Sequence, residues 1–489
     1  MTAPALLGID IGTSSCRAAL WSPDGQRLGG IARVRYHPDL TPDGGATLDP
    51  DALVAAVLRM LDRLPLTRPV AAVGLATFWH SLLGIGRDGR PVTPLLLWLD
   101  RRSDPDAEQL RAQFDSAAIH ARTGCPIHSS YWPAKLHWLR RTHPAAFAAA
   151  ARWCSFGDYL AEQLTGQCGG TSRALASATG LFDQTAGRWD PDLCAAVGVA
   201  PDQLPPVVSP AALAPLLPPF AARWPAVARI PWLPASGDGA ASNVGAGCLT
   251  PDRLTIMVGT SAAARVAWRG SAAVAAGLWR YQLDDERVIL GGALNDGGSL
   301  LDWLRRTLRL PRRAALEEAV AAFPPTAHQL TVLPAWGGER SPRWRLAVRG
   351  ALLGARLETT PIAIYRAALE AIALQLGRIV ALLDAALSAP VRTVVATGSA
   401  LLGSPALQQI LADVIGRPLQ RSAVPEASSR GAALLAAERV GLLRTPLDAL
   451  PPPVDGVIEP IAARAASYRE ALARLIAAER ALEEAALIG

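Results

Sequence analysis

The sequence predicts an α/β protein of two related domains with a cleft between them. Three observations lead to this prediction. A strand–turn–strand motif opens the chain, the same motif returns in the second half, and elsewhere short apolar strands alternate with helical segments. With 489 residues, half of them hydrophobic, the chain is long enough for two large cores.

The first motif spans residues 6–20, where one apolar run leads into Gly-Thr-Ser-Ser and a second apolar run follows. Gly12 permits a tight turn, and the hydroxyls of Thr13 and Ser14 stand beside free N–H groups that suit phosphate oxygens. Asp10 ends the first strand. A carboxylate there would repel phosphate unless a cation lay between, so it indicates Mg²⁺, bound mainly through water. An ordinary hairpin with a polar tip is the alternative at this point.

The second motif spans residues 254–266 and turns at Gly259, Thr260 and Ser261. Two phosphate-type hairpins, one in each half, predict two related domains that close on one nucleotide. We expect the first domain to cover residues 1–245 and the second to cover residues 246–489.

The remaining elements of the first half follow from local signals. We expect strands at 29–36, 70–76 and 95–98, a helix from Asp49 to Leu64, a mostly helical region at 103–165, and a proline-rich linker at 201–234. The strand at 70–76 delivers Phe78, Trp79, His80 and Ser81 at its C-terminal end, where open α/β sheets usually bind ligands. A Gly-x-Gly-x-x-Gly pattern at Gly84, Gly86 and Gly89 precedes Arg-Pro rather than a helix, so it predicts a turn between strands.

In the second half, residues 291–298 lead into a helix that carries Trp303, and Val394-Val395 is a strand. Helices are expected at 361–387, from Glu426 onward, and at 460–486. A further helix has complete end signals, with Ser404 as the N-cap, Pro405 at N1 and Gly416 at C′.

Composition excludes several classes of protein. The pI is near 9.3, but the formal charge is only +6 and the arginines are scattered, so we expect no nucleic-acid partner. No run of 18 uncharged apolar residues occurs and no signal peptide is evident, which predicts a cytoplasmic protein without a membrane span. Lys135 is the single lysine among 48 basic residues. It lies in Pro-Ala-Lys-Leu, so a Walker A loop is excluded.

Asp238 is the leading candidate for a catalytic base. It lies between two glycines at the start of a predicted helix, directly after the proline-rich linker. A helix N-terminus favours the ionised carboxylate. Phosphoryl transfer needs positioning, charge neutralisation and one acceptor for the hydroxyl proton. A helix-capping aspartate without chemistry is the alternative.

Two phosphate hairpins around a cleft are the arrangement of actin-like ATPases and sugar kinases. Over nearly its full length the chain resembles the FGGY family of carbohydrate kinases, whose catalytic base falls on Asp238 and whose adenosine-site glycine pair falls on Gly398 and Ser399. The family's Glu-Ala-Ser-x-x-Gly-Ala-Ala segment matches residues 426–433. Within the family the resemblance is closest to gluconokinases. It rests on residues 79–82, 123–128, 176–182, 295–298 and 338–344, the last of which is shared in part with xylulokinases. Ser399 and Trp79 depart from the usual glycine and methionine, and Trp132 stands where a small residue or proline is usual.

The resemblance implies the two-domain actin-like fold with an interdomain cleft, ATP and Mg²⁺ as cofactors, and a small sugar or sugar acid as the substrate. It places the cofactor at Asp10, Gly12, Thr13, Ser14, Arg17, Gly259, Thr260, Ser261, Gly298, Asp302, Gly398 and Ser399, with Asp10 toward the metal. It places the sugar at Trp79, His80, Arg101, His128, Lys135 and Asp238. Gluconate is an anion, so a cationic contact is expected, and Lys135, His128 and Arg101 stay open as candidates for it.

The implied reaction is the ATP-dependent phosphorylation of D-gluconate to 6-phosphogluconate. A pentulose or polyol kinase of the same family is the alternative, and a non-catalytic actin-like nucleotide-binding protein is a more remote one. The sequence leaves the oligomeric state open, with a homodimer as one option.

Overall fold

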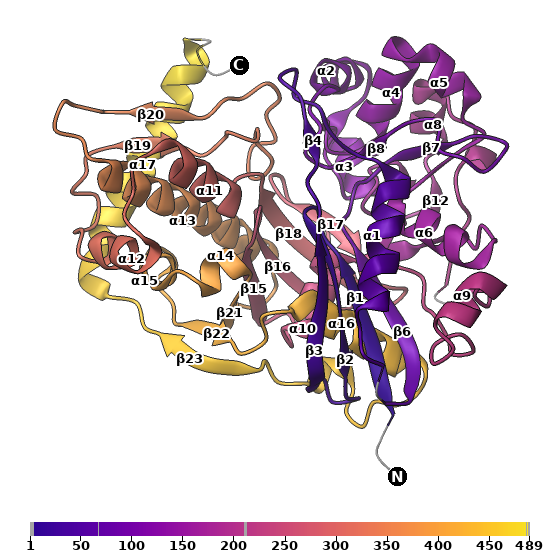
Figure 1. The fold of residues 1–489 in the computed structure, drawn as a ribbon. Coiled ribbons are helices and arrows are strands. Elements are labelled where there is room, and N and C mark those ends of the chain that lie inside the picture. Colours follow the sequence, from indigo (N-terminus) through magenta and orange to yellow (C-terminus); the bar gives the residue numbers. More distant parts are fainter. Residues whose placement is uncertain (1–3, 67, 210–212, 486, 488–489) are drawn as a thin grey trace.

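The computed structural model describes residues 4–66, 68–209, 213–485 and 487. Figure 1 shows two lobes side by side, the first coloured indigo to magenta and the second mostly orange to yellow. Each lobe is built around one mixed β-sheet that carries helices. Within the described residues, no helix is both long and apolar enough to cross a membrane.

The first sheet has five strands in the order β14–β6–β1–β2–β3. They are β1 (Ala5–Ile11), β2 (Ser15–Trp21), β3 (Arg27–Arg35), β6 (Val70–Thr77) and β14 (Ser236–Gly237). β1 and β2 form the expected antiparallel hairpin, and β6 and β14 run parallel to β1. Every residue of β1 is buried, which explains its nearly unbroken apolar sequence. Because the three strands are parallel, their ends at Ile11, Thr77 and Gly237 meet at one edge of the sheet.

The second sheet repeats this plan with seven strands in the order β17–β18–β16–β15–β21–β22–β23. They are β15 (Arg253–Val258), β16 (Ala262–Arg269), β17 (Trp279–Gln282), β18 (Arg287–Leu294), β21 (Thr393–Thr397), β22 (Leu419–Ser422) and β23 (Val454–Ile458). β15 and β16 form an antiparallel hairpin, and β21 runs parallel to β15, as β6 does to β1. The predicted two-domain α/β fold with a repeated hairpin is therefore present.

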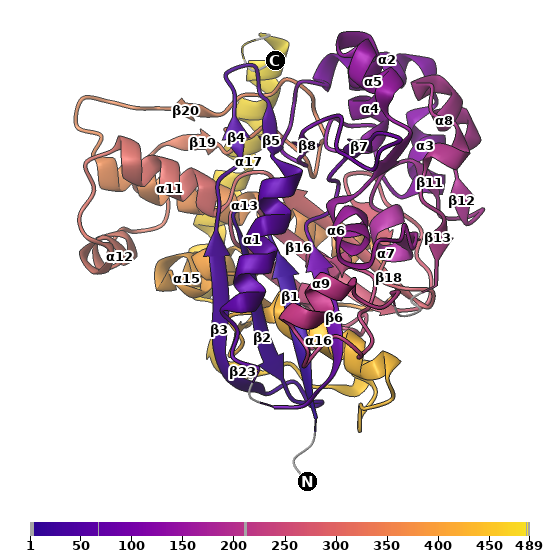
Figure 2. The same ribbon diagram turned by 45° about the vertical axis from the view of Figure 1, so that its right-hand side comes forward.

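Helices and short strands complete the two lobes. The first lobe carries α1 (Pro50–Asp62), α2 (Asp104–Gln113), α3 (Ser116–Thr123), α4 (Trp132–Thr142), α5 (Pro144–Ala149), α6 (Phe156–Thr165), α7 (Arg173–Ala176), α8 (Pro191–Val197) and α9 (Pro218–Arg223). The second carries α11 (Gly298–Thr307), α12 (Arg313–Ala321), α13 (Pro361–Ala386), α14 (Ser399–Leu402), α15 (Pro405–Ile415) and α17 (Ala465–Glu484). The short strands are β4 (Asp39–Leu40), β5 (Ala46–Leu48), β7 (Leu83–Ile85), β8 (Leu95–Leu96), β9 (Arg152–Cys154), β10 (Thr171–Ser172), β11 (Phe182–Asp183), β12 (Arg188–Trp189), β13 (Val207–Val208), β19 (Thr331–Leu333) and β20 (Ala351–Leu353). Figure 2 shows α1 crossing one face of the first sheet.

Two helices cross between the lobes, α10 (Asp238–Gly245) and α16 (Ala427–Arg439), and they pack at backbone contact. A Cβ at Gly431 would lie 1.7 Å from the carbonyl oxygen of Ala241, so only glycine allows this approach. The Ser429 hydroxyl donates to the carbonyl of Gly8 in β1 at 2.9 Å. α16 thus lies against the first sheet, as Figure 1 also shows, although its sequence belongs to the second half.

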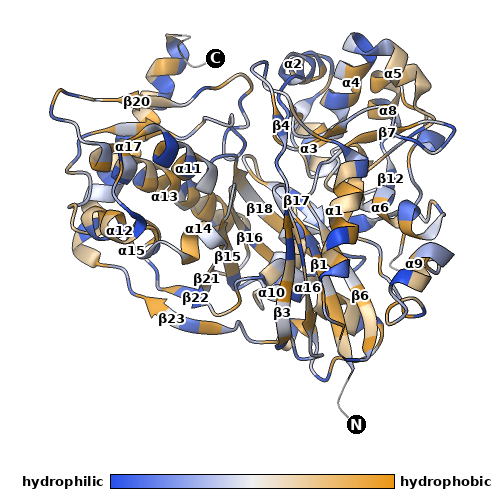
Figure 3. Cartoon of the chain, in the orientation of Figure 1, coloured by the Kyte–Doolittle hydropathy of each residue, from blue (hydrophilic) through white to orange (hydrophobic). Residues whose placement is uncertain are grey.

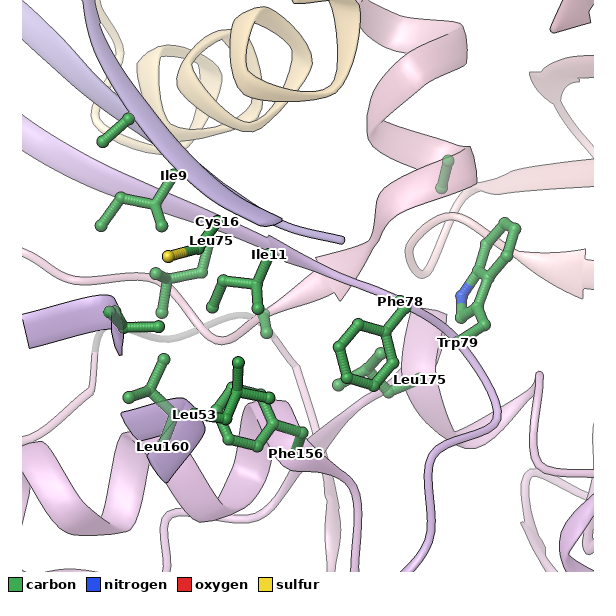
Figure 4. Packing of buried hydrophobic residues seen from close by; sticks show 14 of the residues in the cluster. Ile9, Ile11, Cys16, Leu53, Leu75, Phe78, Trp79, Phe156, Leu160 and Leu175 are labelled. Atoms are coloured by element: carbon green, nitrogen blue, oxygen red, sulfur yellow. The ribbon is translucent and has the colours of Figure 1, made fainter. Parts of the chain in front are cut away.

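The hydrophobic cores follow the two sheets. In Figure 3 the sheet strands and the inner faces of the helices are largely orange, whereas blue residues gather on outer turns of helices and in loops. Figure 4 shows the core of the first lobe, where Ile9, Ile11 and Leu75 pack toward Leu53 and Phe156. Phe78 and Trp79 lie at one end of this cluster, so the core itself holds the segment after β6 in place.

Most local predictions agree with the structure. Asp49 caps α1 through its side chain, and Ser404 and Gly416 cap the two ends of α15. The expected strand at 95–98 is shorter, with β8 covering two residues. The proline-rich stretch is not all linker, because it contains α9 and β13. Residues 210–212 of that stretch and residue 486 of the last predicted helix lie outside the described residues.

Candidate active site

Asp238 is the first residue of α10 and lies at the edge of the first sheet where β1, β6 and β14 end. The two glycines that flank it are required by Trp79, whose indole ring lies across them. A Cβ at Gly237 would lie 1.8 Å from the indole Nε1, and one at Gly239 would lie 2.4 Å from the same ring. The Gly-Asp-Gly pattern therefore fixes the carboxylate beside Trp79, and any larger neighbour would displace one of the two.

The pKa of the Asp238 carboxyl lies close enough to neutral pH for this group to accept a proton and release it again. Desolvation and the nearby charge of Asp10 raise its pKa to about 6, while Arg265 acts in the opposite direction. Its Oδ1 accepts a hydrogen bond from the N–H of Gly239 at 2.7 Å. A carboxylate with a pKa of about 6 is ionised at neutral pH and can take a proton from a bound hydroxyl.

The first hairpin turn is supported from outside the hairpin. The N–H of Gly12 donates to the carbonyl of Ser15 at 2.9 Å, which closes the turn. The Trp98 indole donates to the hydroxyl of Thr13 at 3.0 Å. Ser14 is exposed at the tip. The turn thus keeps backbone and hydroxyl groups at the surface, as a phosphate site requires.

Asp10 fits a magnesium-binding role. Its Oδ2 pairs with Arg17 Nε at 2.9 Å, and Arg17 in turn pairs with Glu426 at 3.1 Å. Its Oδ1 is buried and accepts no hydrogen bond from any of the described residues. Asp10 also lies close enough to Asp238 to raise the pKa of that group. Two adjacent carboxylates, one with a free oxygen, suit a cation that completes its shell with water and phosphate oxygens.

The second hairpin is the centre of a glycine cluster. Gly298, at the start of α11, donates its N–H to the carbonyl of Gly259 at 2.7 Å, and a Cβ there would approach that oxygen to 2.5 Å. Gly398 has φ of +88°, and its Cβ would lie 2.5 Å from the carbonyl of Val258. Gly298 therefore contacts Gly259, and Gly398 contacts the neighbouring Val258, so all three glycines gather where a bound phosphate can approach bare backbone.

Other predicted cofactor residues lie at the surface around this cluster. Thr260 and Ser399 are exposed, Ser261 is partly exposed, and Ser399 is the first residue of α14. The Asp302 side chain is 71% exposed and pairs with Arg305 at 3.4 Å, so it is not buried with the glycines. The side chain of Ser399 has room, although the family pattern has glycine there.

Aromatic rings from both lobes form a wall next to Asp238. Trp79 contacts Tyr281 edge-to-face, with centroids 5.0 Å apart, and Tyr281 stacks on Trp279. The His80 ring contacts Tyr131 and Tyr281. The hydroxyls of Tyr131 and Tyr281 lie 2.7 Å apart, a hydrogen bond that joins the two lobes.

Lys135 holds the backbone of His80 through a hydrogen bond to its carbonyl. His80 has φ of +66°, an uncommon backbone conformation for a residue with a side chain. The Lys135 ammonium is buried and donates to the carbonyls of His80 at 3.0 Å and Ser130 at 2.8 Å. Burial lowers its pKa to about 7. Two of its three N–H donors are therefore engaged by backbone carbonyls, and the expected contact with a substrate carboxylate stays a prediction.

Arg101 and His128 lie where the lobes meet. A Cβ at Gly338 of the second lobe would lie 2.7 Å from Arg101 Nε, so this side chain spans the boundary. Arg101 also lowers the pKa of Asp296, which burial raises to about 6. His128 packs edge-to-face on Trp344 with centroids 5.3 Å apart, and burial among arginines holds its pKa well below the ordinary value.

Two arginines of the second lobe were missed as site residues. Arg265 in β16 is 3% exposed and lies beside Gly239, and Arg340 is 8% exposed with its guanidinium 4.6 Å from the Trp98 ring. A signal for Arg265 exists in the sequence, because it is the single charge in the apolar run 262–268. Arg340 belongs to the segment 338–344, where the resemblance was noted without a role for this side chain.

Comparison with known proteins agrees with this geometry. Residues 5–245 match the N-terminal domain of the FGGY family of carbohydrate kinases, and residues 254–439 match its C-terminal domain. The fold is that of a two-domain sugar kinase. The chain belongs to the FGGY family of carbohydrate kinases.

Individual relatives differ in their substrates. The chain is 26% identical to a gluconokinase of Bacillus subtilis, over 98% of this chain and 96% of the relative. It is 32% identical to a glycerol kinase of Aromatoleum aromaticum, over 89% and 90% of the two chains. The structure of a gluconate kinase from Lactobacillus acidophilus superposes with a TM-score of 0.86 at 24% identity, with 98% of each chain covered. The family is therefore clear, and the particular sugar is a separate question.

Proposed function

We propose that this protein transfers the γ-phosphoryl group of ATP to the terminal hydroxyl of D-gluconate, forming 6-phosphogluconate. The observation that carries the proposal is the position of Asp238. It follows directly on the first sheet, lies near Asp10 of the first hairpin, and interacts with Arg265 in the second strand of the second hairpin.

In this proposal residues 1–245 hold the sugar and the first phosphate hairpin, and residues 246–489 hold the nucleotide. Asp238 accepts the proton of the attacking hydroxyl. The two turns bind phosphate oxygens through N–H groups other than those of Gly12 and Gly259, which close the turns. Asp10 holds Mg²⁺ through the carboxylate oxygen that Arg17 does not contact. The metal, when bound, neutralises charge on the phosphates. The interlobe hydrogen bond between Tyr131 and Tyr281 keeps the cleft closed against water, which would otherwise compete as acceptor.

An anionic sugar is supported by the positive charge around two buried histidines. Burial and the nearby Arg340 hold the pKa of His80 and His128 well below the ordinary value, so both rings are neutral. Arg101 acts on the pKa of His128 in the same direction. Arg340 donates one hydrogen bond to the carbonyl of Leu294, while its buried Nε has no partner among the described residues. A carboxylate on the substrate would compensate this positive charge.

A neutral polyol or pentulose is the second candidate. It is favoured by the glycerol kinase relative, whose 32% identity exceeds that of the gluconokinase. The same base and the same hairpins would serve either substrate, so the choice between the two substrates depends on the side chains that contact the sugar.

The test is coupled ADP release with gluconate, xylulose, ribulose, glycerol or no sugar. We expect turnover with gluconate to exceed that with each neutral compound. Turnover restricted to a neutral sugar would move the assignment to the second candidate. Sugar-independent nucleotide binding without turnover would indicate a non-catalytic nucleotide-binding protein. Asp238→Asn is the matched control, because it keeps the shape of the site and removes the proton acceptor.

A further inference from the structure

Arg265 is a buried cation whose hydrogen-bonding groups are incompletely used. Its side chain is on β16, 3% exposed, and desolvation lowers its pKa to about 10. Both Nε and Nη2 are buried and have no hydrogen-bond partner within the described part of the chain. Buried N–H groups without partners are rare in folded proteins and destabilise them. This edge of the guanidinium is therefore shaped for a group that arrives from outside the chain.

The same edge binds carboxylates elsewhere in this protein. Arg141 holds Asp106 through Nε and Nη2, at 3.1 and 2.7 Å. Arg223 holds Asp62 through the same two atoms, at 2.8 and 2.5 Å. In both pairs the planar fork faces the two oxygens of one carboxylate, which is the geometry that guanidinium favours. A carboxylate is thus the natural partner for the unpaired edge of Arg265.

The position of this edge matches one end of a substrate whose other end reaches Asp238. Arg265 Nη1 lies beside Gly239, where a Cβ would approach it to 2.4 Å. In a planar guanidinium the Nε and Nη2 edge faces away from Nη1, so it faces away from the backbone next to the base. A sugar acid carries its carboxylate and its terminal hydroxyl at opposite ends. The residue that binds the carboxylate must therefore point away from the residue that binds the terminal hydroxyl.

We infer that the Nε and Nη2 edge of Arg265 binds the carboxylate of the sugar-acid substrate and is the residue that selects acids over neutral sugars. The inference rests on the proposed function and deepens it. It replaces Lys135, whose ammonium is held by backbone carbonyls, with a residue of the second lobe. Because Asp238 and Trp79 belong to the first lobe, an acid bound to Arg265 bridges the cleft, and binding of the acid favours closure.

The test compares wild-type protein with Arg265→Gln and Arg265→Lys, with Arg223→Gln as a control arginine far from the cleft. Binding of gluconate to the full chain is measured by calorimetry without nucleotide, and kcat/KM is measured with gluconate and with a neutral polyol. Loss of a charged bidentate contact predicts gluconate binding about 30-fold weaker in Arg265→Gln. Because Arg265 also acts on the pKa of Asp238, both substrates should lose kcat/KM, and the loss should be about 30-fold larger with gluconate than with the neutral polyol. Arg265→Lys keeps the charge but not the fork, so it should recover only part of the affinity.

Thermal unfolding separates this role from a structural one. Because Nε and Nη2 of Arg265 have no partner in the described part of the chain, Arg265→Gln should melt at or above the wild-type temperature. At the same gluconate concentration, the rise in melting temperature should be larger for the wild type than for the variant. An equal loss with gluconate and polyol, or a lower melting temperature without ligand, would overturn the inference in favour of a phosphate-binding or structural arginine. Failure of the proposed function is recognised on the wild type alone, as turnover with neutral sugars only.

Discussion

Replacing Asp238 with asparagine should abolish activity and at the same time stabilise the protein. In the native structure, desolvation and the charge of Asp10 raise the pKa of this carboxyl from 3.8 to about 6. The folded chain therefore binds this proton more readily than the unfolded chain. The protonated form stabilises the fold below pH 3.8, and this stabilisation is lost as pH rises through 6. At neutral pH the ionised carboxylate lowers the free energy of unfolding.

The size of the effect follows from the pKa change, since one pKa unit is worth about 1.4 kcal/mol. At pH 8 the ionised carboxylate lowers the free energy of unfolding by about 3 kcal/mol, and at pH 5 by about half of that. Asparagine is neutral at every pH and its Oδ1 can still accept the hydrogen bond from Gly239. Asp238→Asn should therefore gain up to about 3 kcal/mol at pH 8, and the gain should shrink at pH 5.

Urea unfolding followed by tryptophan fluorescence at pH 8 and pH 5 measures the stability, and coupled ADP release measures the activity. We expect kcat to fall by about 10²–10⁴-fold, the usual contribution of a positioned proton acceptor. In the wild type, kcat/KM should fall about tenfold between pH 7 and pH 5 as the base is protonated. Asp62→Asn is the control of opposite sign, because Arg223 lowers the pKa of Asp62 and stabilises the ionised form. A variant at Asp238 that is less stable at pH 8, or a gain that is the same at both pH values, would refute the reasoning.

Three further changes test other parts of the site. Lys135→Met removes the donor to two buried carbonyls, so urea unfolding should show a loss of about 2 kcal/mol and the KM for gluconate should rise as His80 loses its support. An unchanged stability would contradict this role. Gly298→Ala places a Cβ 2.5 Å from a carbonyl of the second hairpin, so the KM for ATP should rise about tenfold or more while gluconate binding stays the same. Gly30→Ala, which meets nothing within 4 Å, is its control, and equal effects of the two would be evidence against the close approach. Ser399→Gly should change the KM for ATP by less than about twofold, because Ser399 is exposed at the start of α14. A large gain in ATP affinity would show that the side chain obstructs the nucleotide.

Part of the site could be predicted from the sequence because it is formed by short runs of consecutive residues. The Gly-Thr-Ser turns, the Gly-Asp-Gly pattern and the end signals of α15 each involve a few consecutive residues, and each forms the local structure that the pattern predicts. The contact of Gly298 and Gly398 with the second hairpin was implied only by resemblance. For Gly398 the physical cause is the parallel pairing of β15 and β21, which brings residues more than a hundred positions apart to one edge. For Gly298 it is the antiparallel pairing of β16 and β18, because β18 ends shortly before this residue.

The sequence by itself determined the α/β class, the two phosphate-type hairpins, the candidate base and the family, since these depend on short patterns of apolar, glycine and hydroxyl residues. Only the tertiary structure decided which charges face the cleft. It set the ammonium of Lys135 against two carbonyls and packed α16 of the second half on the first sheet. It also placed Arg265 Nη1 beside Gly239 and left Nε and Nη2 without a partner among the described residues. The reason is that hydrogen-bond satisfaction and burial of a polar group depend on neighbours from distant segments, which no local pattern encodes.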